Sequence, residues 1–165
     1  MREKYQPFEI FFRIKRSNMS KVLDGIKQRA VKLNKHIVLP EGEDKRVVEA
    51  AAVSVKEGVA RITLLGNPDE IKKNNPDVDL TGVTIIDPKT YSKTEEYANL
   101  LYELRKEKGM TPELARETLA KDYTMYGALM LKAGDVDGMV SGACHSTANT
   151  LRPGLQVIKT AKGTP

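Results

Sequence analysis

Short aliphatic runs alternate along this chain with longer segments of helical period, and that alternation restricts the folds open to it. Runs of strand type occupy residues 36–40, 60–66, 83–87 and 137–140. Between them, apolar residues recur at spacings of three and four, as on one face of a helix. Strands that alternate with amphipathic helices predict an α/β fold, here a three-layer α/β/α sandwich with a mainly parallel sheet and right-handed crossovers.

Local signals predict where the helices begin and end. The expected helices cover residues 20–33, 46–57, a short segment from 67, 92–109, 111–134 and a last segment from about 150. Asn67 caps the short helix, and Ser92, with an acid three residues later, has the spacing of a capping box. Thr111 and Pro112 begin the longest helix, which is predicted to run without interruption to Gly134.

Composition excludes some classes of function. The length of 165 residues suits one domain. The formal net charge is +5, but the basic residues do not form the continuous basic surface that is typical of nucleic-acid binding. Residues 1–18 hold five basic and two acidic residues, so +3 of that charge lies there, while the rest mixes both signs without interleaved aromatics. No apolar run reaches the length of a membrane span. We therefore expect neither a nucleic-acid nor a membrane partner.

Residues 1–18 are expected to be an extension outside the folded domain. Met19 stands directly before the first helical pattern, so these residues fit an over-called translation start or a disordered tail. Their apolar patch contains Glu9 and is followed by no small-residue cleavage site, which excludes a signal peptide. An arm that binds a membrane surface or a partner is the alternative.

The only cysteine, Cys144, limits both compartment and chemistry. No internal disulfide can form, so we expect a reducing compartment, the cytoplasm. With one cysteine and two histidines in the chain, we expect no metal site. Cys144 fits a small semi-buried residue better than a nucleophile or a ligand.

Two polar loops follow predicted strands, where α/β sheets bind their ligands. "SGACHSTANTLRPG", residues 141–154, gathers several hydroxyls and one arginine. Because Pro153 suits the first turn of a helix, Thr150 or a neighbour would cap that helix and Arg152 would lie at its opening. Free amides, hydroxyls and the guanidinium would then converge on a phosphate or another anion. The alternative is that these residues only cap the helix and complete a tight turn.

The other candidates each have a structural interpretation beside the chemical one. His145 could act as a general base or orient a phosphate, but no partner carboxylate is apparent, which favours a structural histidine. The loop "PEGEDKR", residues 40–46, could bind a metal or supply acid and base. A solvated loop in which Asp44 caps the next helix is favoured. Arg105 lies near a helix carboxyl end, where a cation is stabilising in any case.

Five motifs together resemble the phosphate acetyltransferase (phosphotransacetylase) family. They read "LPEGEDKRVVEAAA", "LLGNPDEI", "IIDPKT", "YELRKEKGMT" and "VDGMVSGACHSTANTLRPGLQVIKTAKG", and the resemblance runs in order from Met19 to Pro165. It implies interconversion of acetyl-CoA plus phosphate with CoA plus acetyl phosphate, without a metal or a permanently bound cofactor. It also implies two α/β domains similar to isocitrate and isopropylmalate dehydrogenases, with the active site between them, and a homodimer.

The resemblance also assigns roles to residues. Arg152 matches a family arginine at the substrate and CoA site, and Arg105 matches one associated with the phosphates of CoA. The residues that would line the cleft are Ser141, Gly142, His145, Ser146, Thr147 and Thr150. In the implied reaction an aspartate takes the proton of the CoA thiol, the thiolate attacks the acetyl carbonyl, and phosphate leaves. No covalent role for Cys144 is implied.

The family's catalytic aspartate and its Ser-Arg pair belong to a motif that would lie beyond Pro165. We therefore expect residues 19–165 to be an amino-terminal α/β domain, truncated before the second domain and inactive alone. Two alternatives stay open. One is a non-catalytic acyl-CoA-binding regulatory domain, as in multidomain malic enzymes, and the other is a phosphate butyryltransferase.

Overall fold

The central feature is a parallel sheet of four short strands. The computed structural model describes residues 20–160 and 163, so the predicted extension, 1–18, lies outside the described residues. The strands are β1 (His36–Leu39), β2 (Arg61–Leu65), β3 (Thr84–Ile86) and β4 (Gly138–Met139). Their order in the sheet is β3-β2-β1-β4, and every neighbouring pair is parallel. All four predicted strands and the α/β class are confirmed.

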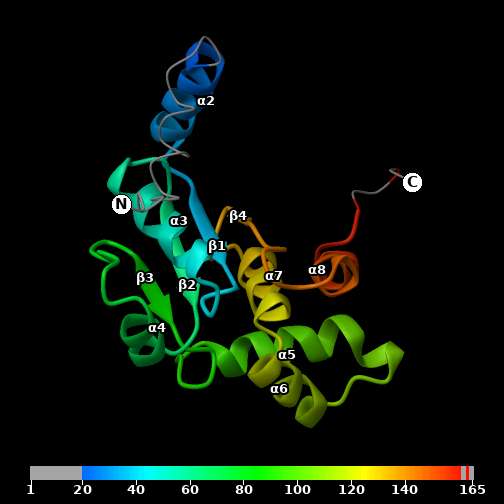
Figure 1. Cartoon of the computed structure of the whole chain (residues 1–165). Helices are drawn as coiled ribbons and strands as arrows, with labels where there is room; N and C mark the ends of the chain where they lie inside the picture. Colours follow the sequence, from blue (N-terminus) through cyan, green and yellow to red (C-terminus); the bar gives the residue numbers. More distant parts are fainter. Residues whose placement is uncertain (1–19, 161–162, 164–165) are drawn as a thin grey trace.

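Helices connect the strands and cover the sheet (Figure 1). Those described are α2 (Ser20–Leu33), α3 (Lys45–Lys56), α4 (Pro68–Asn74), α5 (Thr94–Arg105), α6 (Pro112–Lys121), α7 (Tyr123–Ala133) and α8 (Thr147–Pro153). A 3₁₀ turn, η2 (Lys106–Lys108), follows α5, and a π-helical turn, η3 (Gly154–Ile158), follows α8. None of the helices in the described part of the chain is both long and apolar enough to cross a membrane.

The core lies on both faces of the sheet because successive strand residues point to opposite sides. Val38 and Leu65 belong to the larger cluster, which they form with the buried sides of α5, α6 and α7. Leu39 and Leu64, one residue along each strand, belong to a second cluster with α3 and α4. Coverage of both faces explains why the strands are almost continuously apolar. The predicted three-layer arrangement is confirmed.

A polar group inside the larger cluster fixes the approach to β4. The rings of Tyr97 and Tyr126 meet edge to face with centroids 5.1 Å apart. The Tyr97 hydroxyl donates to Asp135 at 2.6 Å, and Lys93 pairs with the other oxygen of the same carboxylate at 2.5 Å. These donors lower the pKa of Asp135, the Lys93 ammonium most and the Tyr97 hydroxyl next. The segment that leads into β4 is therefore tied to α5.

The helix predicted over 111–134 is two helices, α6 and α7, so that prediction is wrong. Asp122 between them has φ −112° and ψ 89°, outside the helical region, and its carboxylate accepts the amide of Met125. An aspartate side chain competes with the helix for backbone amides, and here it caps a new helix rather than continuing the old one.

The predicted capping box at Ser92 is also wrong. Helix α5 begins at Thr94, and its first flanking residue, Lys93, forms no side-chain cap. The Thr94 hydroxyl instead donates to the carbonyl of Pro88 at 2.7 Å and lies 2.8 Å from the Tyr126 hydroxyl. Tertiary contacts, rather than a local cap, determine where this helix begins.

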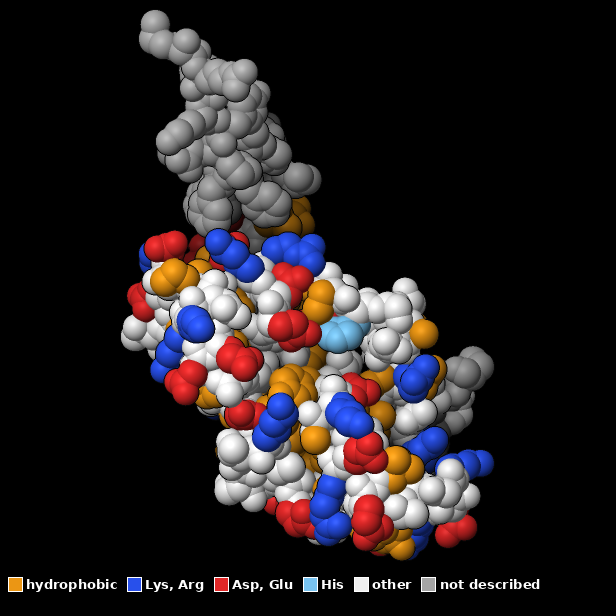
Figure 2. Space-filling model, turned by 60° about the horizontal axis from the view of Figure 1, so that its bottom comes forward, with side chains coloured by type: hydrophobic (Ala, Val, Ile, Leu, Met, Phe, Trp, Pro, Cys, Tyr) orange, Lys and Arg blue, Asp and Glu red, His pale blue; other side chains and the backbone are white. Residues whose placement is uncertain are grey.

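Helix α2 was predicted correctly, but its apolar stripe is not part of either core cluster. Leu23, Ile26 and Leu33 are 56%, 48% and 64% exposed. In Figure 1 the helix extends away from the sheet at the amino-terminal end of the described chain. On the face shown in Figure 2, acidic and basic side chains are interspersed.

Candidate functional site

Two loops that are distant in sequence meet at the carboxyl edge of the sheet. The sheet order puts β2 and β3 on one side of β1 and β4 on the other, so the order of the strands reverses between β1 and β4. Such a reversal of strand order is where open α/β sheets bind ligands. The loop 40–46 follows β1, and residues 140–146, here called the β4 turn, follow β4. Both loops singled out in the sequence therefore belong to one site.

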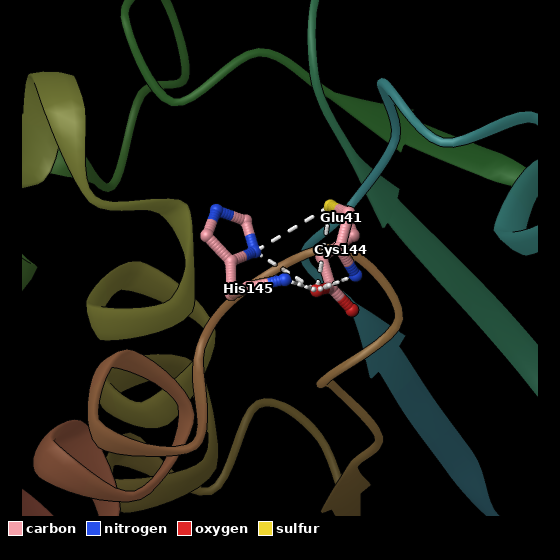
Figure 3. A group of neighbouring side chains, drawn as sticks. All are labelled: Glu41, Cys144 and His145. Atoms are coloured by element: carbon pink, nitrogen blue, oxygen red, sulfur yellow. Dashed lines mark hydrogen bonds and ion pairs between the residues drawn. The ribbon is translucent and has the colours of Figure 1, made fainter.

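Glu41 joins the two loops (Figure 3). Its side chain is only 1% exposed. One carboxylate oxygen accepts the amides of Gly142 and Ala143 at 2.8 and 3.0 Å. The other accepts the amides of Cys144 and His145 at 3.0 and 3.3 Å. Consecutive amides that point to one centre form an anion-binding nest, and the anion in it is a side chain of the chain itself.

Two glycines make this geometry possible. The amide of Gly42 donates to the carbonyl of Leu65 at 3.2 Å, and a Cβ at position 42 would stand 2.2 Å from that oxygen. Only glycine lets the loop after β1 approach β2 so closely. Gly142 has φ +109°, a conformation that other residues rarely adopt, and it turns its amide towards Glu41.

His145 completes the contacts of Glu41. Its Nδ1 lies 2.8 Å from Oε1 of Glu41, and its Nε2 lies 3.8 Å from Oε1 of Glu43. Burial favours the neutral acid of Glu41, but the amides of Cys144 and Ala143 and the His145 ring hold its pKa at about 2. The hydrogen bond with Glu41 raises the pKa of His145. The two side chains therefore form an ion pair over the range in which Glu41 is ionised and His145 is protonated.

Cys144 is exposed but is not an activated thiol. Its Sγ lies 3.5 Å from Glu41 and 3.6 Å from Glu43. Partial loss of hydration at the sulfur and the two nearby carboxylates raise the pKa of the thiol to about 12. A nucleophilic cysteine needs a lowered pKa, so this environment opposes covalent catalysis.

The side chains of Glu41, Cys144 and His145 also resemble a set of metal ligands. One donor atom from each lies within 4.8 Å of the others. However, Oε1 of Glu41 already accepts two amides and the His145 ring. A carboxylate oxygen with three hydrogen-bond donors has no free lone pair for an ion. The geometry is that of a hydrogen-bonded ion pair rather than of a metal centre.

The polar residues of the β4 turn differ from the prediction in their local roles. Ser146, not Thr150, caps α8, since its hydroxyl accepts the amide of Asn149 at 3.3 Å. The Thr150 hydroxyl donates to the Ser146 carbonyl at 3.1 Å, and Thr147 is the first residue of α8. The predicted free amides are not free, because those of residues 142–145 are bonded to Glu41.

Arg152 lies in the last turn of α8 rather than at its opening, so that part of the prediction is wrong. Pro153 is the last residue of α8, inside the helix instead of in its first turn. Pro153 has no amide to donate, and the chain changes there to a π-helical turn in which the amide of Lys159 bonds to Gly154 at 2.9 Å. The change of register accommodates the proline without ending the helical path.

The two arginines from the family resemblance stand on different elements. Arg152 is exposed on α8, and Arg105 is the half-buried last residue of α5. Helix α5 contacts η3, the turn that follows α8. Within residues 20–160, neither guanidinium takes part in a hydrogen bond or an ion pair with another described side chain. The β4 turn and the helix that follows it, α8, thus carry the predicted residues from Ser141 to Arg152, whereas Arg105 comes from α5.

A groove of about 280 Å³ runs beside Glu41. Its lining residues are Leu39, Glu41, Arg46, Val47, Ala50, Val140, Ser141 and Ala143. Arg46 bridges the two loops, since it pairs with Asp44 at 2.6 Å and donates to the carbonyl of Ala143 at 2.7 Å. The hydroxyl oxygen of Ser141 is buried and has no hydrogen-bond partner within the described residues.

Glu41 is a residue of this site that the sequence did not predict. The expectation of a solvated loop over 40–46 and the expectation that His145 has no carboxylate partner are both wrong for this residue. The capping role predicted for Asp44 is confirmed, because its carboxylate accepts the amide of Arg46 at 2.9 Å. The available signal was that both polar loops follow strands, which can be neighbours in a parallel sheet.

Comparisons with known proteins give a consistent result. The family model described as phosphate acetyl/butaryl transferase matches residues 21–165. The phosphate acetyltransferase of Acetivibrio thermocellus is 56% identical over 142 residues, which cover 86% of this chain and 42% of that protein. The phosphate acetyltransferase of Escherichia coli is 51% identical over 137 residues, which cover 81% of this chain and 19% of that protein.

Solved structures agree with these matches. A phosphotransacetylase from Streptococcus pyogenes superposes with a TM-score of 0.83 at 37% identity, over 90% of this chain and 45% of that one. The EutD phosphotransacetylase from Staphylococcus aureus gives 0.82 at 36% identity, over 90% and 46%. The chain spans less than half the length of each of these proteins.

Proposed function

The chain belongs to the phosphate acetyl/butaryl transferase family, and on that basis we propose that the whole protein transfers an acetyl group between CoA and inorganic phosphate. The resemblance that the sequence motifs indicated is confirmed for the family. The reaction proposed is acetyl-CoA plus phosphate to CoA plus acetyl phosphate, and it is reversible. We also propose that the whole protein works as a cytoplasmic homodimer.

In the proposed mechanism the CoA thiolate attacks the acetyl carbonyl of acetyl phosphate directly, and phosphate leaves. Both substrates are anionic, so such a transfer depends on positioning and on cations that offset negative charge. The cations proposed from this chain are Arg152 and Arg105, whose guanidiniums are unpaired within the described residues. The aspartate that would take the thiol proton belongs, by family resemblance, to sequence beyond Pro165.

One observation carries the proposal for the site: the β4 turn is fixed at the sheet edge where α/β proteins bind ligands. Glu41 holds its backbone from inside, and the side chains of His145, Ser146 and Thr147 remain on the exposed side. We propose that they line the substrate cleft with Ser141, Gly142 and Thr150. A preformed turn of this kind lowers the cost of ordering the site when substrate binds.

A hybrid enzyme tests the proposal. Residues 21–165 of this chain replace the matched part of the Acetivibrio thermocellus phosphate acetyltransferase, which is 42% of that protein. The hybrid is expected to form acetyl-CoA from acetyl phosphate and CoA. It should use acetyl phosphate as a substrate faster than butyryl phosphate. A hybrid that folds and associates like its parent but transfers no acyl group would contradict the proposal and favour a regulatory acyl-CoA-binding role.

Arg152→Ala in the hybrid tests the arginine. We expect kcat/KM to fall about 100-fold, the usual loss when a group that stabilises developing negative charge is removed. The matched control is Arg116→Ala, because Arg116 is exposed on α6 and bonded to Glu95 at 3.0 Å, away from the β4 turn. Equal activity of the two variants would mean that Arg152 has no role in the proposed substrate site.

A further inference from the structure

The imidazole of His145 is held on one side and open on the other. Nδ1 is engaged by Glu41 at 2.8 Å, whereas the ring side chain as a whole is 35% exposed. Glu41 cannot rotate to follow the ring, because four backbone amides hold its carboxylate. A buried carboxylate that accepts one ring N–H fixes the orientation of a histidine and directs the other nitrogen outwards. Figure 3 shows the second ring nitrogen pointing away from Glu41.

The carboxylates around the ring favour its protonated form, in which the outer nitrogen, Nε2, carries an N–H that can donate to an anionic ligand. Glu41, Glu43 and Asp122 act on it as carboxylates and raise its pKa, the Glu41 hydrogen bond most. Cys144, 3.6 Å from Nδ1, has a raised pKa and adds no thiolate charge. Of these groups only Glu43 faces Nε2, at 3.8 Å, and its side chain is 57% exposed. A solvated carboxylate at that distance can be displaced by an incoming anion.

We propose that Glu41 is a positioning residue for His145, and that Nε2–H of His145 donates a hydrogen bond to the phosphoryl group of the acyl phosphate or to free phosphate. This inference rests on the proposed function and adds a specific contact to it. The proton on Nδ1 stays there, hydrogen-bonded to Glu41, so His145 transfers no proton in the reaction. If the ring loses its second proton, Nε2 becomes an acceptor and can no longer bind phosphate as a donor.

The pair can be tested first in the 165-residue chain by NMR. The chain has two histidines, His36 and His145, so His145→Asn assigns the ring signals by subtraction. In Glu41→Gln we expect the His145 pKa to fall markedly, and in the matched control Glu43→Gln to fall less, because the Glu41 hydrogen bond is the largest cause of the raised value. A His145 titration that does not respond to Glu41→Gln in a folded variant overturns the positioning role.

Two replacements of His145 in the hybrid enzyme then separate a substrate contact from a structural role. Asparagine can keep a donor where Nδ1 meets Glu41, and glutamine can keep a donor where Nε2 points outwards. We expect His145→Asn to raise KM for phosphate about tenfold or more, as for the loss of a charge-assisted hydrogen bond, and His145→Gln to raise it less. KM for CoA should change little in both.

The pH dependence gives a third readout. KM for phosphate should rise as the pH passes above the His145 pKa, and that rise should be absent in His145→Gln. If His145→Asn and the parent hybrid have equal KM for phosphate, or if asparagine is the milder change, the contact with phosphate is refuted. Because glutamine and asparagine leave Glu41 with its four amides, both variants are expected to fold even where Glu41→Gln does not.

The two proposals fail in different ways. A folded but inactive hybrid refutes the acetyl transfer, and the inference is then judged in the 165-residue chain, where inorganic phosphate should raise the His145 pKa. Absence of that response, together with an inactive hybrid, refutes both. If the hybrid is active and its KM for phosphate is unchanged by the His145 replacements, only the inference about His145 is refuted.

Discussion

The turns after β2 and after β4 satisfy the same backbone requirement in different ways. Each leads from a parallel strand towards a helix and leaves amides without a strand partner. After β2, the side chain of Asn67 accepts the amides of Asp69 and Glu70 at 2.9 and 3.2 Å, two and three residues along the chain. After β4, four amides are bonded to Glu41, which is 101 to 104 residues away. A local cap belongs to one helix, whereas the long-range contact links the β4 turn to β1.

The two kinds of support leave different numbers of side chains available to a ligand. The turn after β2 contributes its polar side chain to its own backbone, so little is left for a ligand. The β4 turn is held by a residue outside it, which leaves most of its own side chains on the exposed side. Long-range support therefore lets one segment be ordered and available for binding at the same time.

Glu41→Ala should have the largest effect of the changes that test this comparison. A carboxyl pKa of about 2 instead of 4.5 corresponds to about 3 kcal/mol of stability at neutral pH, since a tenfold change in proton affinity is worth about 1.4 kcal/mol. The variant also leaves the amides of residues 142–145 without their acceptor. Chemical denaturation of the 165-residue chain at pH 7 measures the loss. Glu43→Ala, at an exposed position in the same loop, is the control and should cost less than about 0.5 kcal/mol.

Lowering the pH should reduce the difference in unfolding free energy between the parent chain and Glu41→Ala. The pKa of Glu41 is lower in the folded chain than its ordinary value of 4.5, so its contribution is complete above pH 4.5 and is lost as the pH falls towards 2. The gap in unfolding free energy between the parent and Glu41→Ala should therefore narrow over that range. Other carboxylates titrate in both proteins and cancel in the comparison. A gap that stays constant from pH 7 to pH 3 would mean that Glu41 acts through packing rather than through its charge.

Asn67→Ala should have a smaller effect, because it removes one local cap. Loss of such a side chain costs about 1 kcal/mol, and Asn67→Asp should restore most of it. Amide exchange can separate the two turns: Asn67→Ala should affect residues 69–71 and leave those of the β4 turn protected. If Asn67→Ala destabilised the chain as much as Glu41→Ala, the contrast between local and long-range support would be lost.

What the sequence could predict follows the same division. The cap at Asn67 and the helix start at Thr111 and Pro112 depend on neighbours no more than three residues away, and both are confirmed. The strands were predictable because two-sided burial makes each one an aliphatic run. The polar loop already indicates Arg152 as a candidate, whereas Arg105 is indicated by the family resemblance alone, because no local pattern marks it.

Glu41 could not be predicted from its neighbours. It stands among Glu43, Asp44 and other charged residues, and a local window gives all of them the same solvated environment. Only the sheet order puts β4 beside β1, so that the amides after one strand meet a carboxylate after the other. Two further predictions are wrong for a related reason. The helix predicted from Ser92 begins instead at Thr94, where contacts with Pro88 and Tyr126 determine its start. The helix predicted over 111–134 is divided at Asp122, whose side chain competes for the backbone amide of Met125.

Cys144→Ala should have the smallest effect and shows which part of the β4 turn Glu41 holds. Alanine keeps the amide that donates to Glu41 at 3.0 Å and removes only a weak sulfur contact at 3.5 Å. We therefore expect a change within about 0.5 kcal/mol. The exposed thiol, with its pKa raised to about 12, should react with iodoacetamide at pH 8 roughly tenfold or more slowly than glutathione does. A large loss of stability would mean that the turn depends on the sulfur as well as on its backbone amides, and a fast reaction would mean that the carboxylates do not suppress the thiolate.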